Sequence, residues 1–203
     1  MTAQLTALAI SCTLKPSPAE SSTDLLGSQI LSALAEHGVT GELVRAVDHV
    51  ISPGVEADMG GDDQWPTLRE KVHAADILVL LTPTWMGQQS SVAQRVLERL
   101  DAELSETDDA GRPILFDKVA LAGIVGNEDG AHHIAAILFQ SLNDVGYSVP
   151  AQASVYWNGE AMQTVDYKDL DETPEKVAQA TATAARNAAR LAGLLKADGY
   201  PAE

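Results

Sequence analysis

The stretch DILVLLT, residues 76–82, decides the fold class. It is almost wholly apolar and lacks the alternation of polar and apolar positions that a half-solvated strand shows. A run of this kind is typical of a strand that is covered on both faces of a parallel sheet. The residues that follow, 90–100, place Val92, Val96 and Leu100 on one side of a helix. The stretch therefore predicts one strand–helix unit of an α/β protein.

The same unit recurs on both sides of this stretch. Before it, the pattern predicts strands at residues 5–10 and 41–47 and helices at 23–36 and 66–75. After it, the pattern predicts strands at 118–125 and 149–156 and helices at 131–145 and 175–197. Five such units predict a doubly wound, five-stranded parallel sheet with strand order 2-1-3-4-5 and helices on both faces. No repeat or linker divides the chain, so we expect residues 1–203 to form a single domain.

Composition narrows the range of partners. The 13 Lys and Arg residues against 29 Asp and Glu residues give a net charge of −16, which argues against nucleic acid and anionic membranes as partners. Cys12 is the single cysteine, so the chain forms no internal disulfide and no multi-cysteine metal site, and we expect no metal. The uncharged window 77–94 contains Pro83, Gly87 and a polar second half, so it is not expected to span a membrane. No targeting signal is recognised, and we expect a cytoplasmic protein.

Ligands of such sheets bind at the carboxyl ends of the strands beside the switch point, so the loops after strands one, three and four are the candidates. The first loop, residues 11–23, lacks the glycine patterns of dinucleotide and nucleoside triphosphate sites. It offers Lys15 and a set of hydroxyl groups before a predicted helix: Ser11, Thr13, Ser17, Ser21, Ser22 and Thr23. Hydroxyls and free amides at a helix N-terminus can bind phosphate. An ordinary loop with a helix cap at Ser22 or Thr23 is the alternative.

The loops after strands three and four present aromatic and polar groups. TPTWMGQ, residues 82–88, puts Trp85 in a tight Pro/Gly loop, where its ring edge or the backbone amides can meet a planar ligand. GNEDG, residues 126–130, opens a helix and leaves amides free for a ligand. The alternatives are a Trp85 that packs on the surface and an Asp129 that caps the helix.

Together, these three loops resemble those of the flavodoxin-like NAD(P)H-dependent FMN reductase family. T-x-K and S-S-T within residues 13–23 are similar to that family's Ser-x-Arg and Ser-Asn-Thr, and TPTWMG is similar to its TP-x-Y/W-x-G loop. Lys15 stands in place of the usual Arg, which removes a bidentate fork, and Ser22 stands in place of Asn. The resemblance implies a flavodoxin-like fold with FMN as cofactor and NADH or NADPH as donor. It implies that the phosphate is held by Thr13, Lys15, Ser17, Ser21, Ser22 and Thr23. The flavin ring would be flanked by Pro83, Thr84, Trp85, Met86, Gly87, Gly126, Asn127, Glu128, Asp129 and Gly130.

The activity that this resemblance implies is an FMN-dependent oxidoreductase, acting as a homo-oligomer. Hydride would pass from NAD(P)H through bound FMN to a quinone, another flavin or a similar small-molecule acceptor, with no side chain required as acid or base. Two other functions stay open because one fold hosts many. One is an electron-carrier flavodoxin without nicotinamide chemistry, which the acidic balance favours. The other is a non-enzymatic binding module of the same fold.

Three further features have two interpretations each. Cys12 lies where a helix N-terminus can lower a thiol pKa, but a small packed residue is the favoured interpretation. Tyr156 and Trp157 end the fifth predicted strand and either stack on a ligand ring or line a dimer surface, with ordinary core or surface aromatics as the alternative. The acidic stretches 56–63 and 166–175 are interpreted as solvated loops, with a docking face for a basic protein as the alternative.

Overall fold

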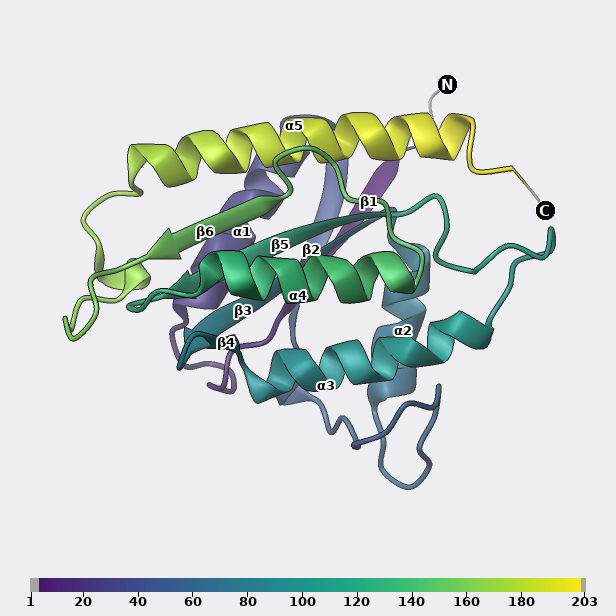
Figure 1. The fold of residues 1–203 in the computed structure, drawn as a ribbon, viewed down its shortest axis with the longest axis horizontal. Coiled ribbons are helices and arrows are strands. Elements are labelled where there is room, and N and C mark those ends of the chain that lie inside the picture. Colours follow the sequence, from purple (N-terminus) through teal and green to yellow (C-terminus); the bar gives the residue numbers. More distant parts are fainter. Residues whose placement is uncertain (1–3, 202–203) are drawn as a thin grey trace.

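The computed structural model describes residues 4–201 and shows a parallel sheet between two layers of helices (Figure 1). The parallel strands are β1 (Leu5–Ser11), β2 (Val39–Arg45), β3 (Ile77–Trp85), β5 (Val119–Gly126) and β6 (Ser154–Asn158). They lie in the order β2-β1-β3-β5-β6. The two-residue strand β4 (Gln88–Gln89) pairs antiparallel with the end of β3. Counted along the five parallel strands, this is the predicted order, so the predicted doubly wound sheet is confirmed.

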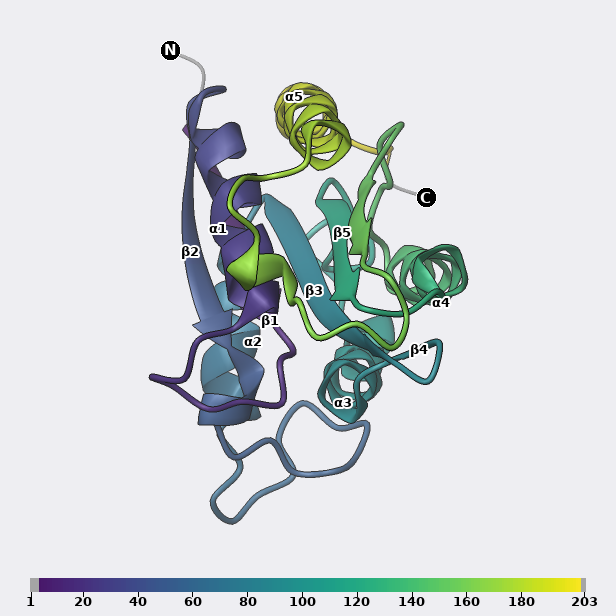
Figure 2. The same ribbon diagram turned by 90° about the vertical axis from the view of Figure 1, so that its left-hand side faces the viewer.

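The helices divide between the two faces of the sheet, as Figure 2 shows from the side. Helices α1 (Ser22–Ala35) and α5 (Glu175–Ala197) pack on one face, and α2 (Trp65–Ala74), α3 (Ser91–Leu100) and α4 (Ala131–Asp144) pack on the other. Three short 3₁₀ helices lie in connections: η1 (Ala46–Asp48), η2 (Asp101–Ser105) and η3 (Tyr167–Asp169). Successive strand residues point to opposite faces, so Ile10 joins the second group of helices and Ala9 joins the first.

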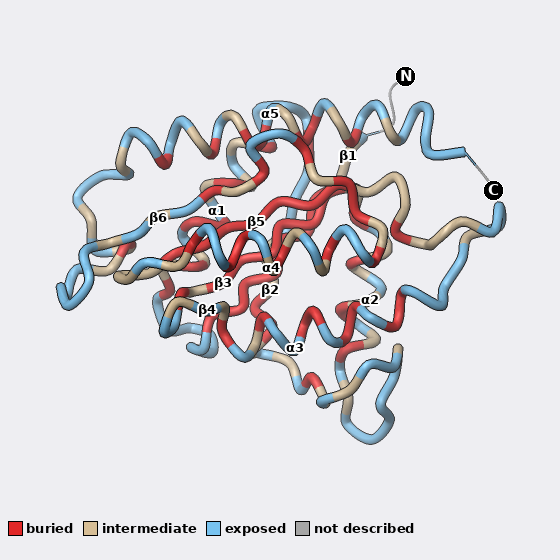
Figure 3. Tube along the Cα trace, viewed as in Figure 1, coloured by how far each residue is buried: buried red, intermediate tan, exposed pale blue. Residues whose placement is uncertain are grey.

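The middle of the sheet forms the core. The central strands β1, β3 and β5 are its most deeply buried part, as Figure 3 shows, and residues 77–81 of β3 are each 1% exposed or less. Helix α5 packs on the sheet through the alanines Ala184, Ala188 and Ala192, whose small side chains allow the helix to approach the strands closely. Within residues 4–201, no helix combines the length and the apolar character needed to cross a bilayer.

The boundaries of several strands differ from the prediction. Strand β3 continues to Trp85 rather than ending at residue 82, so the first part of the predicted loop is strand. Strand β6 begins at Ser154 rather than at residue 149, because Pro150 cannot donate a ladder hydrogen bond and Gln152 has a positive φ of 60°. Strand β2 spans residues 39–45 rather than 41–47. Strand β4 was not predicted, since two residues carry no periodic signal.

The long loop between β2 and α2 is organised from inside by Arg99 of α3. This side chain is fully buried, and its guanidinium donates to the backbone carbonyls of Ser52 (3.1 Å) and Glu56 (2.8 and 3.1 Å). It also forms an ion pair of 2.8 Å with Asp63, whose side chain is likewise buried. Burial opposes the ionisation of Asp63, but the amides of Met59 and Ser52 and the Arg99 guanidinium outweigh it and lower its pKa to about 2. Asp63 therefore holds the loop and is not part of an exposed docking face.

Candidate functional site

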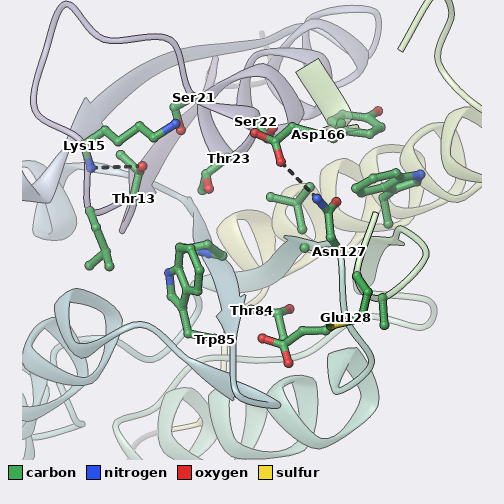
Figure 4. A pocket seen from close by; sticks show the side chains of 18 residues that line it. Thr13, Lys15, Ser21, Ser22, Thr23, Thr84, Trp85, Asn127, Glu128 and Asp166 are labelled. Atoms are coloured by element: carbon green, nitrogen blue, oxygen red, sulfur yellow. Dashed lines mark hydrogen bonds between the residues drawn. The ribbon is translucent and has the colours of Figure 1, made fainter. Parts of the chain in front are cut away.

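A cavity of about 410 Å³ opens at the carboxyl ends of β1, β3 and β5 (Figure 4). The three loops that the sequence singles out converge on it, and a fourth segment, after β6, completes its wall. Of the predicted site residues, those in the wall are Thr13, Lys15, Ser21, Ser22, Thr23, Pro83, Thr84, Trp85, Gly126, Asn127 and Glu128. The predicted residues outside the wall are Ser17, Met86, Gly87, Asp129 and Gly130.

One end of the cavity, which we call the hydroxyl end, is built by Thr13, Lys15 and the start of α1 at Ser21, Ser22 and Thr23. Ser21 is the N-cap, and its hydroxyl accepts from the amide of Asp24 at 3.4 Å. The next two amides of the helix, those of Ser22 and Thr23, have no acceptor within residues 4–201. The Lys15 ammonium is exposed and makes no ion pair with any described residue. Free amides, hydroxyls and a cation at a helix N-terminus form a site for an anion.

The hydroxyl end is braced from behind by Arg45, at the end of β2. Its guanidinium donates to the Lys15 carbonyl at 3.0 Å and also bonds the Ala19 carbonyl and the Asp24 carboxylate. The hydroxyl of Ser11 donates to the other oxygen of that carboxylate. Asp24 lies in the first turn of α1, where its negative charge would otherwise oppose an anion in the cavity. The ion pair between Arg45 and Asp24 offsets this charge, and the bond from Arg45 to the Lys15 carbonyl fixes the loop that carries Lys15.

Ser17 lies outside the hydroxyl end. Its amide and its hydroxyl both donate to the carboxylate of Asp48, at 2.8 and 2.6 Å. These two bonds lower the pKa of Asp48 below its usual value, and the bond from the Ser17 hydroxyl has the larger effect. The Ser17 side chain therefore fixes the loop to η1, and it does not line the cavity.

The other end of the cavity, which we call the aromatic end, is formed by the β3–β4 hairpin. Trp85 pairs with Gln88 across a two-residue turn, Met86 and Gly87, whose φ angles are 54° and 73°. Two positive φ angles define a type I′ turn, the connection that suits the twist of a hairpin. Pro83, Thr84 and Trp85 line the cavity, whereas Met86 at the tip is 90% exposed. Glu128 accepts from the Met86 amide at 2.6 Å and so ties the hairpin to the loop after β5.

Glycines let this loop and the hairpin pack closely. A Cβ atom on Gly126 would lie 2.7 Å from the Cβ of Thr84, and one on Gly130 would lie 2.8 Å from the Cα of Gly87. Gly130 also has a φ of 137°, a backbone conformation that residues with a side chain rarely adopt. Gly87 and Gly130 therefore support the aromatic end from outside the cavity. Asp129, next to them, bonds the Gly130 amide at 2.6 Å and faces solvent.

A single serine joins the first and third loops. The Ser90 hydroxyl donates to the Cys12 carbonyl at 2.7 Å, and the Ser90 amide donates to the hydroxyl of Thr82 at 2.9 Å. All three residues are buried, with 2% exposure or less. The hydroxyl end and the aromatic end are thus connected by hydrogen bonds that water does not reach.

The wall also contains residues that the sequence analysis missed: Leu14, Val125, Ala161, Met162, Asp166 and Tyr167. Trp157 lines the cavity and lies 5.4 Å from the Tyr167 ring, so it is the member of the Tyr156–Trp157 pair that faces the site. Tyr156 points elsewhere, with its hydroxyl 3.0 Å from His132. Tyr167 is the only aromatic residue among the acidic residues of 166–175, and its side chain is buried. This aromatic residue is the sequence signal that could have placed the segment against the site.

Cys12 and the two adjacent histidines take no part in the cavity wall. Cys12 is fully buried, and burial raises the pKa of its thiol far above the usual value. The interpretation of Cys12 as a small packed residue is therefore confirmed. His132 contacts Tyr156, and His133 contacts Gln88 at 3.0 Å, so the two rings serve different neighbours.

Comparison with known proteins identifies the family. The family model described as "NADPH-dependent FMN reductase" matches residues 5–161, which include the first three loops of the cavity. The chain belongs to this family. FMN is the family's cofactor, and the hydroxyl end and aromatic end of the cavity offer the donor groups and flat walls that its phosphate and its ring require.

Two curated relatives and three solved structures are similar to this reductase-family chain. The divalent metal cation transporter MntH of Mycobacterium bovis is 43% identical over 169 residues, which are 81% of this chain and 25% of that relative. The 8-demethyl-8-aminoriboflavin-5'-phosphate synthase of Streptomyces davaonensis is 37% identical over 166 residues, 77% of this chain and 65% of that relative. This chain thus spans a quarter of the first relative's length and 65% of the second's.

One of the solved structures is RosB with a bound intermediate, 8-demethyl-8-formylriboflavin-5'-phosphate. It matches with a TM-score of 0.87 and 32% identity, over 97% of this chain and 82% of that one. A structure called flavone reductase matches with a TM-score of 0.67 at 17% identity and covers 97% of this chain and 66% of its own. An archaeal flavodoxin matches with a TM-score of 0.59 at 8% identity, over 93% of this chain and 99% of its own. These last two likenesses show the flavodoxin-like fold alone.

Proposed function

We propose that this protein is an FMN-dependent oxidoreductase that takes hydride from NADH or NADPH and passes it to a quinone, another flavin or a similar small acceptor. The observation that carries the proposal is that one cavity has two unlike ends. The hydroxyl end suits a phosphate, and the aromatic end suits a planar ring. When bound, FMN supplies the hydride-transfer chemistry, and the protein supplies position and electrostatics.

The residues of the hydroxyl end would bind the phosphate. The hydroxyls of Thr13, Ser22 and Thr23 and the free amides at the start of α1 would donate to the phosphate oxygens, and Lys15 would offset their charge. Thr13 and Thr23 are 5% and 2% exposed, so their donors are held in place before a ligand arrives. Bracing by Arg45 keeps the Asp24 carboxylate from repelling the phosphate.

The residues of the aromatic end would orient the ring. Trp85, Pro83 and Trp157 supply apolar surface, and the loop after β5 supplies Asn127 and its neighbouring amides. Backbone donors near the ring stabilise the negative charge of a reduced flavin. Trp85 is 55% exposed, so this end of the cavity is open to a second planar molecule. No carboxylate or histidine is required to move a proton in this scheme.

The test uses the purified protein mixed with FMN. We expect its visible spectrum to change on binding and the oxidised flavin bands to bleach when NADH or NADPH is added without oxygen. The nucleotide that bleaches the bands faster is the donor, and an acceptor that restores them identifies the acceptor class. Bound flavin that neither nucleotide reduces would overturn the reductase proposal and favour an electron carrier. Protein that takes up no FMN would favour a binding module.

A second candidate is a protein that changes a flavin phosphate chemically. It is favoured by the 32% identity to RosB, a structure that holds a flavin-phosphate intermediate, and by the 37% identity to the flavin-phosphate synthase. To separate the two, the protein is incubated with FMN, denatured, and the released flavin is analysed by mass spectrometry. An unchanged FMN mass after nucleotide-driven turnover supports the reductase. A new flavin mass supports the second candidate.

A further inference from the structure

A carboxylate lies in the cavity wall outside the part of the chain that the family model matches. The match ends at residue 161, and Asp166 follows in the segment between β6 and η3. One oxygen of Asp166, Oδ1, accepts from the Asn127 side-chain amide at 3.1 Å, as Figure 4 shows. Asp166 forms no ion pair with any residue among 4–201, and it is only half-buried. Its second oxygen, Oδ2, receives no hydrogen bond from the described residues and can accept one from a ligand.

Contacts on both sides fix the position of this carboxylate. The next residue, Tyr167, is 2% exposed, and its hydroxyl donates to Gln29 of α1 at 2.6 Å. The residue after that, Lys168, donates its backbone amide to the Ser22 hydroxyl at 3.2 Å. The segment is thus attached to α1 at two points, and Asp166 cannot leave the wall without breaking them.

Asp166 bridges the two ends of the cavity. Through Lys168 its segment contacts Ser22 of the hydroxyl end, and through its own carboxylate it contacts Asn127 of the loop that flanks the aromatic end. In FMN, the part that lies between the phosphate and the ring is a chain that carries three hydroxyl groups. A carboxylate is a strong acceptor for a hydroxyl, and its charge beside a phosphate is unfavourable unless it receives such a bond.

We propose that Asp166 is a specificity residue that recognises the hydroxylated chain of the flavin by accepting a hydrogen bond from one of its hydroxyl groups. The inference rests on the proposed function, because it requires a flavin phosphate in the cavity. It adds to that function a residue that selects the polyol itself, separate from the groups that bind the phosphate and the ring.

The experiment compares two ligands on two variants. The ligands are FMN and an analogue in which a phosphopentyl chain without hydroxyls replaces the phosphoribityl chain. The variants are Asp166→Ala and, as a matched control, Asp171→Ala. Asp171 lies between η3 and α5, and its exposed carboxylate has no hydrogen-bond partner among the described residues. Dissociation constants are measured by flavin fluorescence, so the readout does not depend on turnover. Thermal unfolding checks that each variant folds, and Asp166→Asn is the fallback if Asp166→Ala does not.

We expect Asp166→Ala to weaken FMN binding about tenfold or more, since a hydrogen bond to a charged group is lost. The analogue should bind the variant and the parent within about twofold of each other, because it has no hydroxyl to lose. Asp171→Ala should change neither constant. An equal loss for both ligands, or no loss for FMN, would overturn the role of Asp166. Failure of the parent protein to bind FMN would instead overturn the proposed function together with the inference.

Discussion

Replacing Arg99 by Met is expected to destabilise the protein strongly. Met keeps the apolar stem of the side chain and removes the guanidinium, which leaves the buried Asp63 carboxylate without its partner. It also leaves the carbonyls of Ser52 and Glu56 without donors. Removing one partner of a buried ion pair costs about 3–5 kcal/mol. Asp63 keeps hydrogen bonds from the amides of Ser52, Met59 and Trp65, so we place the loss near the lower limit, at about 3 kcal/mol.

Helix α3 offers a matched control one turn earlier. Arg95 also donates to a carbonyl of the same loop, Ile51 at 3.0 Å, but its side chain is exposed. Arg95→Met should therefore cost about 1 kcal/mol or less. For a chain of 203 residues, the Arg99→Met loss corresponds to a decrease in Tm of about 6–12 °C. Urea unfolding and calorimetry measure both variants, and an Arg99→Met variant as stable as Arg95→Met would refute the reasoning.

Four further outcomes are expected. Lys15→Met should weaken FMN binding about fivefold and leave riboflavin, which lacks the phosphate, unchanged, and an equal loss for both flavins would contradict a role at the phosphate. The folded-state pKa of Asp63 is about 2, below its ordinary value of 3.8, so its contribution to stability is full above that value and is lost as pH falls toward 2. Urea midpoints at pH 5 and pH 2.5 should accordingly differ more in the parent than in Asp63→Asn. Because burial raises the thiol pKa, Cys12 should not react with a thiol reagent in the folded protein at about pH 8 and should react fully in urea, and labelling of the folded protein would count against this burial. Met86→Asn should stabilise the hairpin by up to about 1 kcal/mol, because Asn adopts a positive φ more readily, and an unchanged urea midpoint would argue against the turn geometry.

The sequence predicts the fold well where the signal is local. The apolar runs of β1, β3 and β5 are continuous and bounded by turn residues, so their place in the middle of a parallel sheet follows from the sequence pattern alone. Strand β6 is shorter than its apolar pattern suggests, because backbone constraints at Pro150 and Gln152 interrupt the ladder.

The candidate site is predictable only in part, because some of its residues are placed by contacts with residues far away in the sequence. Thr13 and Lys15 are found because the loop after the first strand always reaches the switch point of such a sheet. Ser17 looks equivalent in sequence, but its hydroxyl is taken by Asp48, 31 positions away, and no local pattern reveals that bond. Asp166 and Tyr167 are missed because their position depends on contact with Gln29, 138 positions from Tyr167.

The hydrogen bonds of Ser90 have a consequence for how a ligand binds. Because Ser90 joins the Cys12 carbonyl to the Thr82 hydroxyl in the interior, the first and third loops behave as one rigid body. A ligand seated at one end finds the other already preorganised, so little conformational entropy is lost on binding.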